Sequence, residues 1–89
     1  MVRKHILFYG WVQGVGFRYY SVLKARSLDL TGWVRNLQDG SVEMEVQGEP
    51  ERIERLIQFL RERPLIEIRY MDVRNLEPED EYGFEEKDE

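Results

Sequence analysis

The chain has 89 residues, of which 42% are apolar and 35% are charged, and its net charge is −5. A chain of this length builds one small core, and its composition is that of a soluble globule, which excludes a disordered chain and a membrane protein. The length therefore predicts one domain over residues 1–89. The chain has no cysteine and one histidine, His5, which excludes disulfides, thiolate nucleophiles and His-rich metal clusters, so we expect neither a metal nor a cofactor.

The first third of the chain predicts a strand, a glycine-rich loop and a helix. Residues 5–9 alternate, with Ile6 and Phe8 on one face, which is typical of a strand. Three glycines interrupt any regular period within residues 10–18 and predict a loop. A helix is expected over about residues 19–28.

The middle of the chain predicts a hairpin and a second helix. Residues 31–36 and 41–47 are strand-like and are joined by a short connection that ends at Gly40. Pro50 suits the first turn of a helix, and Pro64 forbids its continuation. The apolar stripe of this helix consists of Ile53, Leu56, Ile57 and Leu60.

The last part of the chain predicts one long strand and an optional short one. Residues 66–74 are strand-like, with a break in alternation at residues 68–71 that indicates a bulge, and residues 82–85 form the optional strand. The order β-α-β-β-α-β predicts a ferredoxin-like α+β sandwich, with two helices on one face of an antiparallel sheet. Many unrelated functions use this fold, so function has to be argued from a site.

A candidate anion site lies in the loop before the first helix. Glycines allow successive backbone N–H groups to turn inward, and the helix N-terminus adds partial positive charge. Arginine adds a planar, charged fork for two phosphate oxygens. A tight connection with a solvated arginine explains the spacing equally well. The candidate residues are Gln13, Gly14, Val15, Gly16, Phe17 and Arg18.

Asn36 is the second candidate, because it ends a predicted strand just before the hairpin. Its amide can both donate and accept a hydrogen bond, which suits the orientation of a water molecule. The alternative is an Asx turn that starts the hairpin, which is the commoner use of asparagine at such a position.

Two segments resemble the signatures of the acylphosphatase family. Residues 10–18, Gly-Trp-Val-Gln-Gly-Val-Gly-Phe-Arg, are similar to the first signature. The second is matched by Gly-Trp-Val-Arg-Asn at residues 32–36, followed by Gly40, Val42 and Gly48. The rest of the predicted order also fits the family's ferredoxin-like fold, so the resemblance covers nearly the whole chain.

The resemblance implies an enzyme that hydrolyses the carboxyl-phosphate anhydride bond of small acyl phosphates. It implies that Arg18 binds the phosphate and that Asn36 orients the attacking water, without a metal. The sequence departs from the usual family pattern at Asp29, where many relatives have a glycine that closes the first helix. It also departs in the acidic residues 84–89, which predict a short last strand, and in residues 64–71, which lack a Gly-Pro connection.

Charge and hydropathy add expectations about location and partners. Residues 1–36 carry six basic residues and one acidic residue, whereas residues 37–89 carry 7 basic and 17 acidic ones, which suits a small anionic ligand better than a polyanion. A chance distribution with a solvated acidic tail is the alternative. No apolar run approaches a membrane span, and residues 1–5 lack the apolar stretch of a signal peptide, so we expect a cytoplasmic protein without membrane partners.

Several other interpretations compete with the enzyme. Tyr9 and Tyr70 on an open sheet face would suit RNA, but the aromatic RNP pattern is absent, so no nucleic-acid partner is expected. Trp11 and Trp33 either contact the acyl group or serve ordinary packing. A non-catalytic phosphate-binding or regulatory module is the main alternative, because similar domains occur inside larger carbamoyl-transfer proteins. We expect a free-standing monomer, because no long apolar stripe is left outside the core.

Overall fold

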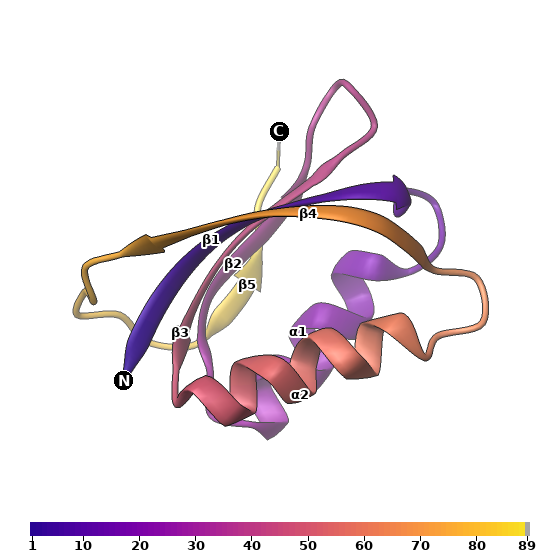
Figure 1. Ribbon diagram of the computed structural model, residues 1–89. Helices are drawn as coiled ribbons and strands as arrows, with labels where there is room; N and C mark the ends of the chain where they lie inside the picture. The colour runs from indigo at the N-terminus through magenta and orange to yellow at the C-terminus, as the bar shows by residue number, and fades with distance from the viewer. Residues whose placement is uncertain (89) are drawn as a thin grey trace.

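The structure is a computed structural model that describes residues 1–88. Figure 1 shows two helices packed side by side against one face of a sheet. The predicted element order is confirmed, the optional last strand forms, and the fold is the ferredoxin-like α+β type. The elements are β1 (Val2–Trp11), α1 (Phe17–Ser27), β2 (Thr31–Asn36), β3 (Val42–Gly48), α2 (Pro50–Arg61), β4 (Glu67–Leu76) and β5 (Phe84–Glu86).

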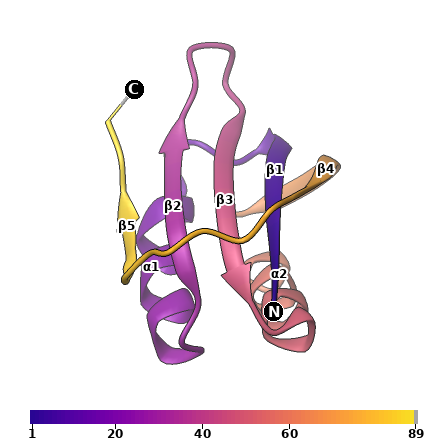
Figure 2. The ribbon, with the colours of Figure 1, turned by 90° about the vertical axis from the view of Figure 1, so that its left-hand side faces the viewer.

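The sheet has the strand order β4-β1-β3-β2-β5. The four longer strands pair antiparallel, as predicted, whereas β5 pairs in parallel with β2 and places Phe84 opposite Gly32. The sheet is therefore mixed rather than purely antiparallel. This direction follows from the chain path, because the chain leaves β4 at one edge and crosses to the other edge before β5 can pair (Figure 2).

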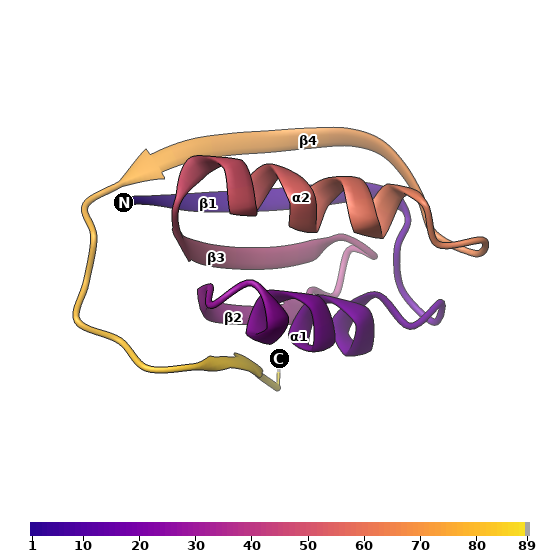
Figure 3. The same cartoon turned by 90° about the horizontal axis from the view of Figure 1, so that it is seen from below.

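The core lies between the sheet and the two helices (Figure 3). Alternate residues of the central strands point into it, including Ile6 and Phe8 on β1, both of which are fully buried. The predicted helix stripe supplies Ile53, Leu56 and Leu60 from α2. This packing fixes the ends of β1 and β2, where the candidate site residues lie.

β1 is longer than predicted because Gly10 lies within the strand. A Cβ added to Gly10 would come within 2.2 Å of the Glu67 carbonyl oxygen, so glycine permits the close approach of β4. Tyr70 and Ile68 of β4 pair with successive residues of β1, which leaves Arg69 as an extra residue. The predicted bulge is thus confirmed, and the glycine interpreted as part of a loop belongs to it.

α1 begins at Phe17, two residues before the predicted start. It ends at Ser27, and Asp29 follows its C-cap residue, Leu28. Asp29 has a φ of 56°, the left-handed conformation for which relatives use glycine. The backbone N–H of Leu30 then donates to the carbonyl of Ala25 at 2.9 Å. The departure at Asp29 therefore leaves the helix end intact.

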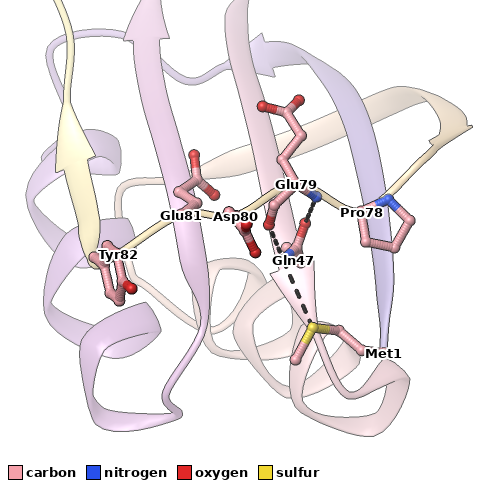
Figure 4. A pocket seen from close by; sticks show the side chains of 7 residues that line it. All are labelled: Met1, Gln47, Pro78, Glu79, Asp80, Glu81 and Tyr82. Carbon is pink, nitrogen blue, oxygen red and sulfur yellow. Dashed lines mark hydrogen bonds between the residues drawn. The ribbon is translucent and has the colours of Figure 1, made fainter.

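Residues 77–83, which we call the strap, connect β4 to β5 across the sheet face opposite the helices (Figure 2). Gln47 of β3 holds the strap by its backbone, as Figure 4 shows. Its amide oxygen accepts a hydrogen bond from Glu79 N–H, and its amide nitrogen donates to the Glu79 carbonyl, each at 2.8 Å. The Gln47 side chain thus bonds to both backbone groups of Glu79, as a neighbouring strand would, although the strap is not a strand.

Arg3 of β1 is the second attachment of the strap. Its side chain is 1% exposed, donates to both carboxylate oxygens of Glu81 at 2.7 and 3.3 Å, and donates to Glu45 at 2.9 Å. Its hydrogen bonds to Glu81 raise the pKa of Arg3 above its ordinary value, against the opposite effect of burial, and Glu45 acts in the same direction as Glu81. A buried cation thus ties the first strand to the segment that leads into the last one.

Candidate active site

The glycine-rich loop lies between the end of β1 and the start of α1. Gly14 and Gly16 have φ values of 75° and 84°, and Gly16 is the N-cap of α1. A Cβ added to Gly14 would meet nothing within 4 Å, so the glycine is required by its backbone conformation and not by space. The loop therefore turns through two left-handed glycines directly before the helix N-terminus, a position that suits an anion.

A pocket of about 150 Å³ opens at this loop. It brings Arg18 of α1 together with Asn36 at the end of β2, although the two residues belong to different elements. Gly14, Gly16 and Phe17 of the predicted set also line it, whereas Gln13 and Val15 do not. The complete lining consists of Val12, Gly14, Gly16, Phe17, Arg18, Tyr19, Asn36 and Glu86.

Gln13 connects the loop to the hairpin. Its amide nitrogen donates to the carbonyl oxygens of Leu37 and Ser41, at 2.7 and 2.8 Å. Val15 packs against the core instead of facing the pocket. Both residues therefore set the position of the loop relative to Asn36, and their side chains leave the pocket to the glycines and Arg18.

The hairpin turn after β2 uses Asp39 as its capping residue. The Asp39 carboxylate accepts hydrogen bonds from the hydroxyl and the backbone N–H of Ser41, and these bonds lower its pKa below the ordinary value. Within residues 1–88, no hydrogen bond joins the Asn36 side chain to another residue. The Asx turn considered for Asn36 is thus formed by Asp39, and Asn36 lines the pocket.

Glu86 is a pocket residue that the sequence did not predict. Its carboxylate lies 3.6 Å from Nε of Arg18, and both side chains are partly exposed, at 51% and 37%. The acidic residues near the C-terminus were interpreted as a solvated tail. Only the parallel pairing of Glu86 with Val34 of β2 brings this carboxylate to the loop, and no local pattern signals such a pairing.

The two tryptophans do not line the pocket. Trp11 is 63% exposed at the end of β1. Trp33 lies under Lys87 and Arg35, whose charged groups are 4.4 and 5.4 Å from the centre of an indole ring. These contacts fit the packing interpretation of Trp33, whereas Phe17 and Tyr19 are aromatic residues that line the pocket.

The open sheet face offers no comparable anion site. Tyr9 and Tyr70 lie together there, with ring centres 5.7 Å apart, but Glu43 and Glu45 of β3 share the face. The pocket between Met1 and the strap, about 470 Å³ in volume, is lined by Glu79, Asp80 and Glu81 (Figure 4). Cations at both places are paired with carboxylates, and among the described residues neither place has a helix N-terminus. The loop at Arg18 adds the backbone N–H groups that precede α1, so it is the better candidate.

The described residues, 1–88, contain no cluster of three or more His, Asp or Glu side chains placed to hold a metal ion. None of their helices has the length and apolar character needed to cross a membrane. The pocket itself contains one cation, one carboxylate, one amide and the backbone of a helix N-terminus. This donor set suits a small anion with several oxygen atoms.

Comparison with known proteins gives consistent results. The acylphosphatase family matches residues 4–86. Over 84 residues the chain is 48% identical to an acylphosphatase of Thermococcus kodakarensis, and this match covers 93% of the chain and 92% of the relative. The structure matches that of the acylphosphatase from Bacillus subtilis with a TM-score of 0.89 at 29% identity, over 98% of this chain and 99% of the other.

A larger protein contains a similar domain. The structure matches HypF from T. kodakarensis with a TM-score of 0.82 at 36% identity. The match covers 98% of this chain but only 12% of HypF. The same domain architecture therefore occurs both as most of a small protein and as a minor part of a long one.

Proposed function

Since the chain belongs to the acylphosphatase family, as its two signatures predicted, we propose that it hydrolyses the carboxyl-phosphate anhydride bond of small acyl phosphates. The observation that carries this proposal is the pocket in which Arg18 and Asn36 lie beside the curled loop at the N-terminus of α1. An arginine fork, free backbone N–H groups and a helix dipole together suit a phosphate group.

Binding of the phosphate uses the loop and Arg18. The guanidinium and the backbone N–H groups of the loop residues that line the pocket, Gly14 and Gly16 to Arg18, donate to the phosphate oxygens and stabilise the charge that develops there. Glu86 carries a like charge and already contacts Arg18 at 3.6 Å. The phosphate therefore has to displace the carboxylate from the guanidinium as it enters.

The chemical step needs little beyond this positioning. Asn36 orients a water molecule, whose oxygen attacks phosphorus while the bond from phosphorus to the carboxyl oxygen breaks. The carboxylate leaves with the bonding electrons and, being a weak base, needs no general acid. A proton of the attacking water passes to a phosphate oxygen, so neither a protein base nor a metal takes part.

Asn36→Ala tests the assigned function. We expect kcat for acetyl phosphate, measured with EDTA present, to fall by about 10²-fold, the scale for losing one preorganised donor. The affinity for inorganic phosphate, measured by calorimetry, should change little, because Arg18 and the loop remain.

Asn75→Ala, at an exposed position of β4, is the matched control and should behave as wild type. An equal loss of turnover and of phosphate affinity in Asn36→Ala would contradict the division of roles. A rate that vanishes with EDTA in the wild type would contradict a metal-free step.

A phosphate-binding or regulatory module is the second candidate function, because a similar domain also occurs as 12% of the longer HypF chain. The same pair of measurements separates the two. Turnover of acetyl phosphate by the wild type supports the enzyme, whereas binding of inorganic phosphate without turnover supports the module.

Glu86→Gln should increase the affinity for inorganic phosphate by about twofold to fivefold, because it removes a carboxylate that competes with phosphate for Arg18. An ion pair at such an exposed position contributes up to about 1 kcal/mol, which sets this range. Calorimetric titration at low salt measures the effect. Glu85→Gln, the neighbour on the same strand, is the control for net charge. Equal gains in both variants would assign the effect to overall charge rather than to the pair with Arg18.

A further inference from the structure

A second pocket of about 300 Å³ adjoins the phosphate pocket along the outer face of α1. Tyr19 and Glu86 line both pockets, so the two pockets are neighbours at these side chains. The rest of the second pocket is formed by Val22, Leu23 and Arg26. We call this second pocket the α1 groove.

The α1 groove is unusual for its exposed apolar side chains. Tyr19 and Leu23 are one helical turn apart on α1 and are 63% and 52% exposed. The side chain of Val22 is half-buried and also lines the groove. An apolar strip that begins at the lip of a phosphate pocket is suited to the part of a ligand that follows the phosphate.

We propose that the α1 groove binds the acyl group of the substrate and that the protein prefers acyl phosphates with an uncharged apolar acyl group, such as an aromatic one. This inference rests on the proposed hydrolysis at Arg18. In an in-line displacement, the attacking water and the leaving oxygen lie on opposite sides of phosphorus. Asn36, which orients the water, lines the phosphate pocket but not the groove, so the groove suits the leaving side.

The charges at the groove favour an uncharged acyl group. The carboxylate of Glu86 stands at the junction of the two pockets and repels an acyl group that carries a carboxylate or a second phosphate. Arg26 keeps its positive charge while its Nε donates to the carbonyl of Phe84 at 3.1 Å, so the groove carries one charge of each sign and has no net charge to attract an anionic acyl group. Apolar contact with Tyr19 and Leu23 is then the remaining source of affinity.

The preference is measured as the ratio of kcat/KM for benzoyl phosphate to that for acetyl phosphate. Each methylene-sized group buried is worth about fourfold in binding, so a wild-type ratio of about 10 or more is expected for a partly buried ring. Leu23→Ala should lower this ratio about threefold or more, and alanine keeps the helix propensity of the position. Leu23→Lys should lower it further and should raise kcat/KM for succinyl phosphate, whose acyl group is anionic.

Leu65→Ala, at a position 71% exposed beyond α2, is the matched control and should keep the wild-type ratio. A ratio that is unchanged in both Leu23 variants, while the wild type hydrolyses acetyl phosphate, overturns the groove assignment and leaves the proposed function standing. Failure of the wild type to hydrolyse either substrate overturns both. A ratio lowered by Leu23→Ala but not by Leu65→Ala supports the groove.

Discussion

Replacing Arg18 by alanine is expected to lower kcat for acetyl phosphate by about 10²-fold or more and to weaken the binding of inorganic phosphate in the same protein. Both effects have one cause in the proposed mechanism, in which the guanidinium contacts the phosphate before and during the reaction. This distinguishes Arg18 from Asn36, whose loss should affect turnover alone. Steady-state kinetics and calorimetric titration with phosphate, carried out side by side, measure the two effects.

Arg18→Lys sharpens the test. Lysine keeps the charge but lacks the planar fork, so phosphate affinity should recover in part while kcat stays low. Arg55→Ala on α2, which also removes one exposed arginine, controls for net charge. Turnover near the wild-type value in Arg18→Ala would refute the assignment of the pocket.

Arg3→Met should reduce the free energy of unfolding by about 2–4 kcal/mol, toward the lower end of the range for breaking a buried ion pair. The guanidinium is 1% exposed, and its loss leaves Glu45 and Glu81 facing each other without a counterion. These carboxylates are about one fifth exposed, so water compensates part of the loss. Urea denaturation followed by circular dichroism measures the change.

Arg74→Met is the matched control for Arg3→Met, because Arg74 is 75% exposed and, among residues 1–88, forms one ion pair, with Asp72 at 3.7 Å. Its unfolding free energy should lie within about 0.5 kcal/mol of the wild type. If the two variants lose equal stability, the burial of Arg3 under the strap contributes nothing.

The sequence was sufficient for the parts of the fold that depend on local period. The apolar stripe of α2 predicted that helix, and the alternation of Ile6 and Phe8 predicted β1. The sequence predicts a loop at Gly10 because three glycines close together, Gly10, Gly14 and Gly16, are typical of a loop. Its actual reason, the close approach of β4 at a bulge, depends on a strand far along the chain.

The site was predictable where its residues belong to a sequence motif. Arg18, Asn36 and the glycines carry motifs, and the structure places them in one pocket. Glu86 and the buried state of Arg3 were not predictable, since each depends on the crossing from β4 to β5. An arginine near the start of a chain looks solvated until its long-range carboxylate partners are known.

The parallel pairing of β5 also bears on the order in which the pocket is completed during synthesis. The loop, Arg18 and Asn36 lie in the first half of the chain, and β1, β3 and β2 pair with one another without the last segment. Ribosomes release the N-terminal part first, so these strands can form while Glu86 is still unmade. A nascent chain would then present Arg18 to solution anions without its internal carboxylate. The charge balance of the mature pocket is thus set by the last segment to emerge.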